Sequence, residues 1–265
     1  MWDPGGVKTT MPDGTVVGCD VTGSGLPLLL IHGGATDSSV WTSVRSLLPA
    51  GMRVAAMDRR GRGTSGRDDK HHSLEVEADD VLSVAAALGG EVVVVAHSIG
   101  ATIALQALRR INGLINAALL YEPPLPGMTP PAPAAMIEAL NEGRDEDALE
   151  SFLGDMVGLS ADEIRTYRSS PIWAKRVSLI WTMRREAEAL ASLPQDLARY
   201  STIEVPVQLV LGSQTAPHHT DAIRALQRVL PAADTTLLNG QGHGALLQAP
   251  DLVASAITDL LGRIN

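Results

Sequence analysis

The stretch Val92-Val93-Val94-Val95-Ala96-His97-Ser98-Ile99-Gly100, which continues as Ala101–Leu108, decides the fold of this 265-residue chain. Four consecutive valines predict a buried strand, because β-branched side chains favour strands and the run is far too short to span a membrane. The alanine-rich segment that follows predicts a helix. Ser98 therefore lies at a sharp turn from strand to helix, where only small residues fit two positions to either side, here Ala96 and Gly100. A serine at this apex faces the free amides of the helix N-terminus and is placed to act as a nucleophile.

Composition excludes several other classes of function. The chain has 30 acidic and 21 basic residues, a net charge of −9, and no run of Lys or Arg. We therefore expect neither nucleic acid nor a membrane surface as a partner. Because Cys19 is the single cysteine, an internal disulfide and a cysteine-based zinc site are excluded. We predict that Cys19 is a buried strand residue and not a reactive thiol. Residues 1–6 lack the pattern of a signal peptide, so a cytoplasmic location is expected.

Strand and helix patterns alternate along most of the chain. This alternation predicts an α/β fold, in which a mostly parallel sheet is flanked by helices on both faces. Besides the valine run, strands are predicted at Thr15–Val21, Leu28–Ile31, Arg53–Met57, Ala117–Tyr121, Val205–Leu211 and Thr235–Leu238. Helices are predicted at Val40–Leu48, Leu74–Leu88, Asp221–Leu230 and Ala245–Leu261.

Residues 123–193 interrupt the alternation, because they contain no strand pattern. The block opens with a proline-rich segment and continues with helical stretches at Ala134–Glu142, Glu146–Val157, Ala161–Tyr167 and Trp173–Leu193. We interpret it as a helical cap over the C-terminal edge of the sheet, the edge at which open α/β sheets bind ligands. Residues 1–122 and 194–265 would then form the core, and residues 123–193 the cap.

Four short motifs, in order along the chain, resemble those of the α/β-hydrolase superfamily. They are Leu30-Ile31-His32-Gly33-Gly34, Asp58-Arg59-Arg60-Gly61-Arg62-Gly63-Thr64-Ser65, Ala96-His97-Ser98-Ile99-Gly100 and Gly242-His243. The chain is similar to compact, capped bacterial esterases, lactonases and cofactor-free haloperoxidases of this superfamily. The resemblance implies an α/β-hydrolase fold with a helical cap insertion.

The resemblance also implies the roles of four residues. Ser98 would be the nucleophile, His243 the base, and the backbone amides of Gly34 and Ile99 the oxyanion hole. Each role has a chemical reason. A serine hydroxyl becomes a good nucleophile only when a base removes its proton, and histidine titrates in the required range. The negative oxygen of the tetrahedral intermediate needs fixed donors such as two amides.

The acid of the triad departs from the commonest pattern of the superfamily. The residue expected to be Asp or Glu after the strand ending at Leu211 is Gln214, and an amide cannot stabilise an imidazolium as a carboxylate does. Some superfamily members take the acid from the end of the preceding strand, where this chain has Glu122. We therefore predict Glu122 as the third catalytic residue. Asp221 is the weaker candidate, because it belongs to the following helix.

The remaining polar and aromatic motifs favour structural roles. The pairs His71-His72 and His218-His219 are predicted to lie in polar loops, and no metal site is expected from them because they lack cysteine partners and helical spacing. The motif Asp58-Arg59-Arg60 is interpreted as a loop of arginine–carboxylate pairs. Trp173, Trp181 and Met183 are interpreted as packing residues of the cap. His97 is left open between lining a pocket and pointing away from it.

The residues together favour a serine hydrolase that cleaves a small-molecule carboxylic ester or lactone through an acyl-enzyme, without a cofactor or metal. The same triad supports a cofactor-free perhydrolase or haloperoxidase, or a carbon–carbon bond hydrolase. A small-molecule binding or receptor protein with a weak residual hydrolase site is a further alternative. It stays open because Gln214 occupies the position where the usual catalytic acid is expected. Assembly into a homo-oligomer is compatible with each of these interpretations.

Overall fold

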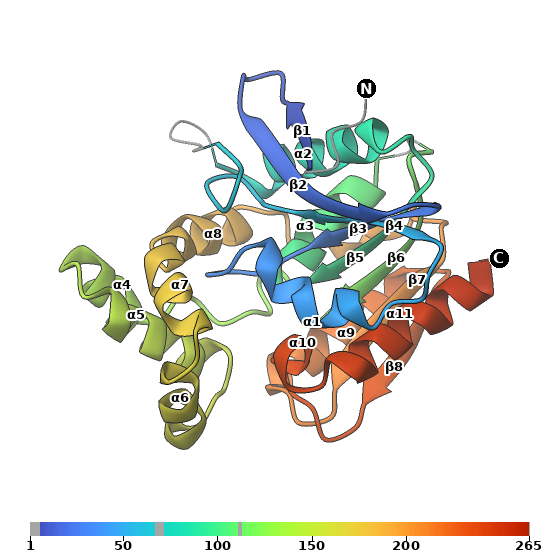
Figure 1. The fold of residues 1–265 in the computed structure, drawn as a ribbon. Coiled ribbons are helices and arrows are strands. Elements are labelled where there is room, and N and C mark those ends of the chain that lie inside the picture. Colours follow the sequence, from blue (N-terminus) through green and yellow to red (C-terminus); the bar gives the residue numbers. More distant parts are fainter. Residues whose placement is uncertain (1–5, 67–71, 111–112, 265) are drawn as a thin grey trace.

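The core of the molecule is one sheet in the order β1-β2-β4-β3-β5-β6-β7-β8 (Figure 1), seen in a computed structural model that describes residues 6–66, 72–110 and 113–264. Strands β1 and β2 pair antiparallel, as do β2 and β4, and the other neighbours are parallel. The strands are β1 (Val7–Thr10), β2 (Val16–Gly23), β3 (Leu26–Ile31), β4 (Met52–Met57), β5 (Val92–His97), β6 (Ile115–Tyr121), β7 (Val207–Gly212) and β8 (Ala233–Leu238). The predicted mostly parallel α/β sheet is therefore confirmed.

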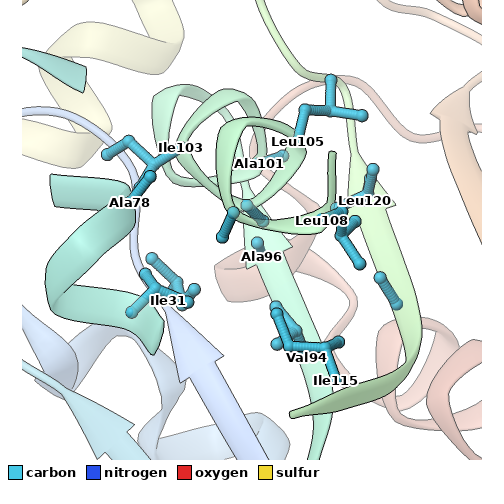
Figure 2. Close-up of a cluster of buried hydrophobic side chains, with 14 of the residues drawn as sticks. Ile31, Ala78, Val94, Ala96, Ala101, Ile103, Leu105, Leu108, Ile115 and Leu120 are labelled. Atoms are coloured by element: carbon cyan, nitrogen blue, oxygen red, sulfur yellow. The ribbon is translucent and has the colours of Figure 1, made fainter. Parts of the chain in front are cut away.

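Helices cover both faces of this sheet. On one face lie α2 (Leu74–Ala87), α3 (Ile99–Leu108) and α9 (Pro217–Val229), and on the other lie α1 (Thr42–Ser46), α10 (Ala245–Gln248) and α11 (Pro250–Ile264). The valine run shows why both faces need covering, because Val92 and Val94 belong to one apolar cluster and Val93 and Val95 to the other. Figure 2 shows the first cluster around Val94. None of the described helices is both long enough and apolar enough to cross a membrane.

Near the two ends of the chain the structure differs from the sequence prediction. Strand β1 was not predicted, and it consists of only four residues at the edge of the sheet, too few to show a clear alternation. The single predicted helix over Ala245–Leu261 is two helices, α10 and α11. The break is at Ala249, whose backbone is not helical, because the residue before a proline is pushed out of the helical region and Pro250 then begins the next helix.

Residues 123–193 contain helices and no strand. The helices are α4 (Ala134–Asn141), α5 (Asp145–Ser151), α6 (Ala161–Arg168), α7 (Ile172–Leu179) and α8 (Thr182–Ala191), with one π-helical turn at Phe152–Met156. In Figure 1 they lie to one side of the sheet. The helix predicted over Trp173–Leu193 is in fact α7 and α8, and the stretch predicted over Glu146–Val157 is α5 plus the π turn.

These helices have an apolar core of their own. Trp173 and Met183 are buried in it, as predicted, together with Met136, Leu149 and other side chains of α4 to α8. Trp181 does not pack there. It is 39% exposed and lies under the guanidinium of Arg185, whose central carbon is 4.8 Å from the ring centre, so the packing role predicted for Trp181 is wrong. Arginine stacking stabilises an aromatic ring that remains partly in solvent.

Buried ion pairs join the helical block to the core. Glu186 of α8 binds Arg59 at 2.9 Å and also pairs with Arg62, while Arg59 binds Glu77 of α2 at 2.7 Å. All four side chains are almost completely buried. The loop that carries the Asp58-Arg59-Arg60 motif therefore has the arginine–carboxylate structure that the sequence predicted, and one of its carboxylates comes from residues 123–193.

We predict that Glu186→Ala will lower the free energy of unfolding by about 3–5 kcal/mol, because it leaves two buried arginines without this carboxylate. The matched control is Asp162→Ala, which removes an ion pair with Arg165 whose side chains are 83% and 70% exposed. Such an exposed pair contributes no more than about 1 kcal/mol. Urea unfolding followed by circular dichroism measures both variants, and equal small losses would contradict the role given to Glu186.

Candidate active site

Ser98 occupies a strained turn between β5 and α3. Its φ of 56° and ψ of −131° lie outside the usual regions for a residue with a side chain. The Ser98 amide donates to the Tyr121 carbonyl oxygen at 2.9 Å, which holds the turn against the end of β6. The side chain makes no capping hydrogen bond to α3, although serine commonly does so at a helix start. The surrounding fold thus holds Ser98 in a strained backbone conformation, and its hydroxyl is not used to cap the helix.

Glycines allow close packing around this turn. A Cβ atom on Gly100 would lie 2.4 Å from the His32 carbonyl oxygen, so α3 can approach the end of β3 only because position 100 has no side chain. A Cβ atom on Gly33 would lie 3.0 Å from the Cβ of Ser98. The loop after β3 therefore passes directly beside the serine and brings Gly34 to the same place. His32 secures that loop, since it donates from Nδ1 to the Gly33 carbonyl oxygen at 2.8 Å.

Glu122 and His243 form a buried hydrogen bond. His243 Nδ1 lies 2.6 Å from Glu122 Oε2, within hydrogen-bond distance. Glu122 is completely buried, and its carboxylate also accepts from the Gly212 amide at 2.8 Å and the Thr215 hydroxyl at 2.9 Å. With Nδ1–H donating to the carboxylate, Nε2 is the ring nitrogen of His243 that is left to accept a proton.

The other two residues considered for the acid position lie elsewhere. Gln214 is exposed, and its backbone amide donates to the Gln241 carbonyl oxygen at 2.8 Å. Asp221 is also exposed, and it lies 3.9 Å from Arg224 on the surface of α9. Of Gln214, Asp221 and Glu122, only Glu122 therefore meets His243. Thr215 was not predicted, because its role depends on the folded loop between β7 and α9.

Two further histidines lie against the ring of His243. His219 stacks on it with a centre-to-centre distance of 4.4 Å and an interplanar angle of 11°. His97 lies 4.5 Å away and donates from Nε2 to the His243 carbonyl oxygen at 3.0 Å. Burial, followed by the charge of His243, lowers the pKa of both flanking imidazoles. Both flanking rings are therefore neutral, and they support His243 without competing for its proton.

The histidine pairs of the sequence have different outcomes. His218 and His219 were predicted to lie in a loop, and this is wrong. They lie in the first turn of α9, because Pro217 begins the helix there. A proline just before the pair was the signal that could have revealed this. His72 contacts Glu77 Oε1 at 2.7 Å, and His71 lies outside the described residues.

One group of side chains within the described residues has the ligand types of a metal site. It consists of Glu122, His219 and His243, whose ligand atoms all lie within 4.8 Å of one another. However, the 2.6 Å between Glu122 Oε2 and His243 Nδ1 is that of a hydrogen bond. Two ligands of a tetrahedral zinc ion, each about 2.1 Å from the metal, would be roughly 3.4 Å apart. The geometry is therefore that of a hydrogen-bonded carboxylate–histidine pair and does not fit a metal.

A cavity of about 470 Å³ opens over these residues, between the sheet and the helical block. Ser98, His97 and His243 line its floor, and Phe152, Leu153 and Val157 contribute apolar walls. A smaller cavity of about 60 Å³ is lined by Gly34, Ser98, Ile99 and His243. The predicted site residues are therefore all in one place, Ser98, Gly34, Ile99 and His243 in the cavity walls and Glu122 behind His243.

Comparisons with known proteins point to a hydrolase family. Residues 28–256 match the model of a family described as alpha/beta hydrolases. The chain is 25% identical over 252 residues to a 2-(acetamidomethylene)succinate hydrolase of Mesorhizobium japonicum, covering 90% of this chain and 89% of that protein. It is 36% identical over 146 residues to a non-heme haloperoxidase of Rhodococcus erythropolis, covering 54% of this chain and 51% of that one. The crystal structure of an alpha/beta hydrolase from Sphaerobacter thermophilus superposes with a TM-score of 0.82 at 25% identity, covering 96% and 100% of the two chains.

We predict that Gly100→Ala will destabilise the protein by roughly 1–3 kcal/mol, because the added methyl group meets backbone atoms of His32 that cannot rotate away. The control is Gly262→Ala in α11, where no atom lies within 4 Å of the added methyl group. That variant should be neutral or more stable by up to about 1 kcal/mol, because alanine favours helices over glycine. Thermal unfolding measures both, and a Gly100→Ala protein as stable as the control would refute the packing described for the turn.

Proposed function

The chain belongs to the alpha/beta hydrolase family, and on that premise we propose that it is a serine hydrolase that cleaves a carboxylic ester or lactone through an acyl-enzyme. The observation that supports this most directly is the buried hydrogen bond of 2.6 Å between Glu122 and His243, beside Ser98 in the floor of the cavity. A nucleophile, a base and a carboxylate that orients the base are the components that acyl transfer requires.

In the first step His243 Nε2 takes the proton of the Ser98 hydroxyl as Ser98 Oγ attacks the carbonyl carbon of the substrate. The carbonyl oxygen becomes negative, and the backbone amides of Gly34 and Ile99 donate to it. The Glu122 carboxylate stabilises the positive charge that forms on His243. The buried, neutral rings of His97 and His219 keep water away from this charge without accepting the proton themselves.

In the second step His243 returns its proton to the oxygen of the leaving alcohol, and the carbon–oxygen bond of the ester breaks. Ser98 is now acylated. His243 then takes a proton from a water molecule as the water oxygen attacks the acyl carbon. The bond between the acyl carbon and Ser98 Oγ breaks, His243 returns the proton to Ser98 Oγ, and the acid leaves. For a lactone the alcohol and the acid are parts of one product. All proton transfers use groups of this chain.

The similarity to a haloperoxidase supports a second candidate, cofactor-free perhydrolysis. In that reaction hydrogen peroxide replaces water as the attacker of the acyl-enzyme, so the first step is unchanged. The alternative of a binding protein with a weak residual site depends on the lack of an acid at Gln214. Glu122 supplies a carboxylate to His243, and this contact favours an enzyme over a binding protein.

We predict that a fluorophosphonate probe will label the protein once, at Ser98, and that Ser98→Ala will abolish both labelling and turnover of p-nitrophenyl acetate. The reason is that only an activated serine beside its base attacks such probes at neutral pH. Intact-protein and peptide mass spectrometry locate the label. Ser38→Ala, at a serine outside the cavity wall, is the matched control and should be labelled like the unmodified protein. Labelling that persists in Ser98→Ala would exclude Ser98 as the nucleophile.

We predict that Glu122→Gln will lower kcat by up to about 10⁴-fold, because an amide cannot stabilise the imidazolium of His243. Asp221→Asn makes the same chemical change on the surface of α9 and should leave kcat within about twofold, as expected for an exposed side chain away from the reacting groups. Steady-state kinetics measure both variants, and thermal unfolding shows whether they are folded. An equal effect of the two substitutions would exclude Glu122 as the acid.

A further inference from the structure

Arg176 of α7 is a cation on the wall of the cavity that the proposed chemistry does not use. It lines the same cavity as Ser98, His97 and His243. Its Nε atom is buried and has no hydrogen-bond partner. Within residues 6–66, 72–110 and 113–264, no carboxylate forms an ion pair with it. Three other arginines of the helical block each bind an acidic side chain, namely Arg144, Arg165 and Arg168.

The surroundings of Arg176 stabilise its charge poorly. Its guanidinium carbon lies 5.3 Å from the centre of the Tyr167 ring, and the buried Tyr167 hydroxyl interacts with the Arg176 guanidinium. Burial lowers the pKa of Arg176, and the contact with Tyr167 offsets only part of this effect. Removing a cation from water without supplying an anion is unfavourable, so the arrangement gains stability when an anion enters the cavity.

The acidic residues of the cavity wall do not supply that anion. Asp162 and Glu163 are the carboxylates among the lining residues, and both are on α6. Asp162 pairs with Arg165. Glu163 Oε2 accepts from the Ser160 amide at 2.8 Å and from the Ser160 hydroxyl at 2.7 Å. Each carboxylate is therefore bound to a partner of its own.

We propose that Arg176, with the Tyr167 hydroxyl, binds a carboxylate group of the substrate, so that the preferred ester is that of an acidic molecule such as the monoester of a dicarboxylic acid. This inference rests on the proposed function. A guanidinium presents a planar set of donors that suits a carboxylate, and a phenol adds one more. The ester carbonyl would lie at Ser98, while the free carboxylate reaches across the apolar cavity to α7.

A pair of substrates of equal size tests the proposal. Monoethyl glutarate carries a carboxylate where ethyl glutaramate carries a neutral amide, and a pH-stat follows the hydrolysis of both. We expect kcat/KM to be about 10- to 100-fold higher for the acidic ester, the range for hydrogen bonds to a charged group. Arg176→Met, which keeps an unbranched apolar side chain and removes the charged guanidinium, should abolish this preference and leave the neutral ester within about twofold. Arg176→Lys should retain part of it, because lysine keeps the charge and loses the planar donor set.

Arg144→Met removes another positive charge of the helical block, at a residue outside the cavity wall, and should leave the preference unchanged. A preference that persists in Arg176→Met, or that is absent in the unmodified protein, would overturn the assignment while Ser98-dependent hydrolysis still supported the proposed function.

Calorimetry with glutarate tests anion binding at Arg176 independently of ester hydrolysis. Glutarate should bind the unmodified protein and the Ser98→Ala variant, and Arg176→Met should weaken this binding about 10- to 100-fold. If neither ester is hydrolysed but glutarate binding depends on Arg176, the proposed function fails and the anion site stands. Binding of inorganic phosphate in place of glutarate would overturn the carboxylate assignment.

Discussion

The carboxylate of Glu122 joins three segments that are far apart in the sequence. It lies at the end of β6, accepts a hydrogen bond from the Gly212 amide at the end of β7 and one from Thr215 in the loop that follows, and binds His243 in the loop after β8. A buried carboxylate without such donors would be strongly unfavourable. The positions of both loops, and therefore of His243, depend on this one group. Its main chain is also unusual, with a φ of 46°.

The order of the strands explains how the end of β6 can supply the acid. Strands β5, β6 and β7 are neighbours in the parallel sheet, so their carboxyl ends meet at one edge. The Ser98 amide donates to the Tyr121 carbonyl oxygen at 2.9 Å, and the Glu122 amide donates to the Val210 carbonyl oxygen at 3.1 Å. A carboxylate on β6 therefore lies between the serine turn and the end of β7, within reach of the histidine loop. The site does not need an acid at Gln214, because the neighbouring strand presents one to the same histidine.

Patterns local in the sequence predicted much of this structure. The valine run, the turn at Ser98 and the helices of residues 123–193 are visible in single segments, since each depends on propensity and on residue size. The strand pattern placed Glu122 at a strand end, but its role was predicted from the resemblance to superfamily members that carry their acid there. Features that depend on tertiary packing were not found. Strand β1 is too short to show a pattern, and the stacking of His219 on His243 requires α9 to be placed against the loop after β8. The exposure of Trp181 likewise depends on how α7 and α8 meet.

The most direct test of the account is a crystal structure of the protein after reaction with a fluorophosphonate. We expect phosphorus bonded to Ser98 Oγ, and its phosphoryl oxygen within about 2.7–3.1 Å of the Gly34 and Ile99 amide nitrogens. His243 should keep its hydrogen bond to Glu122 through Nδ1 and turn Nε2 towards Ser98. An adduct whose phosphoryl oxygen points away from both amides, or a His243 that pairs with a group other than Glu122, would contradict the account.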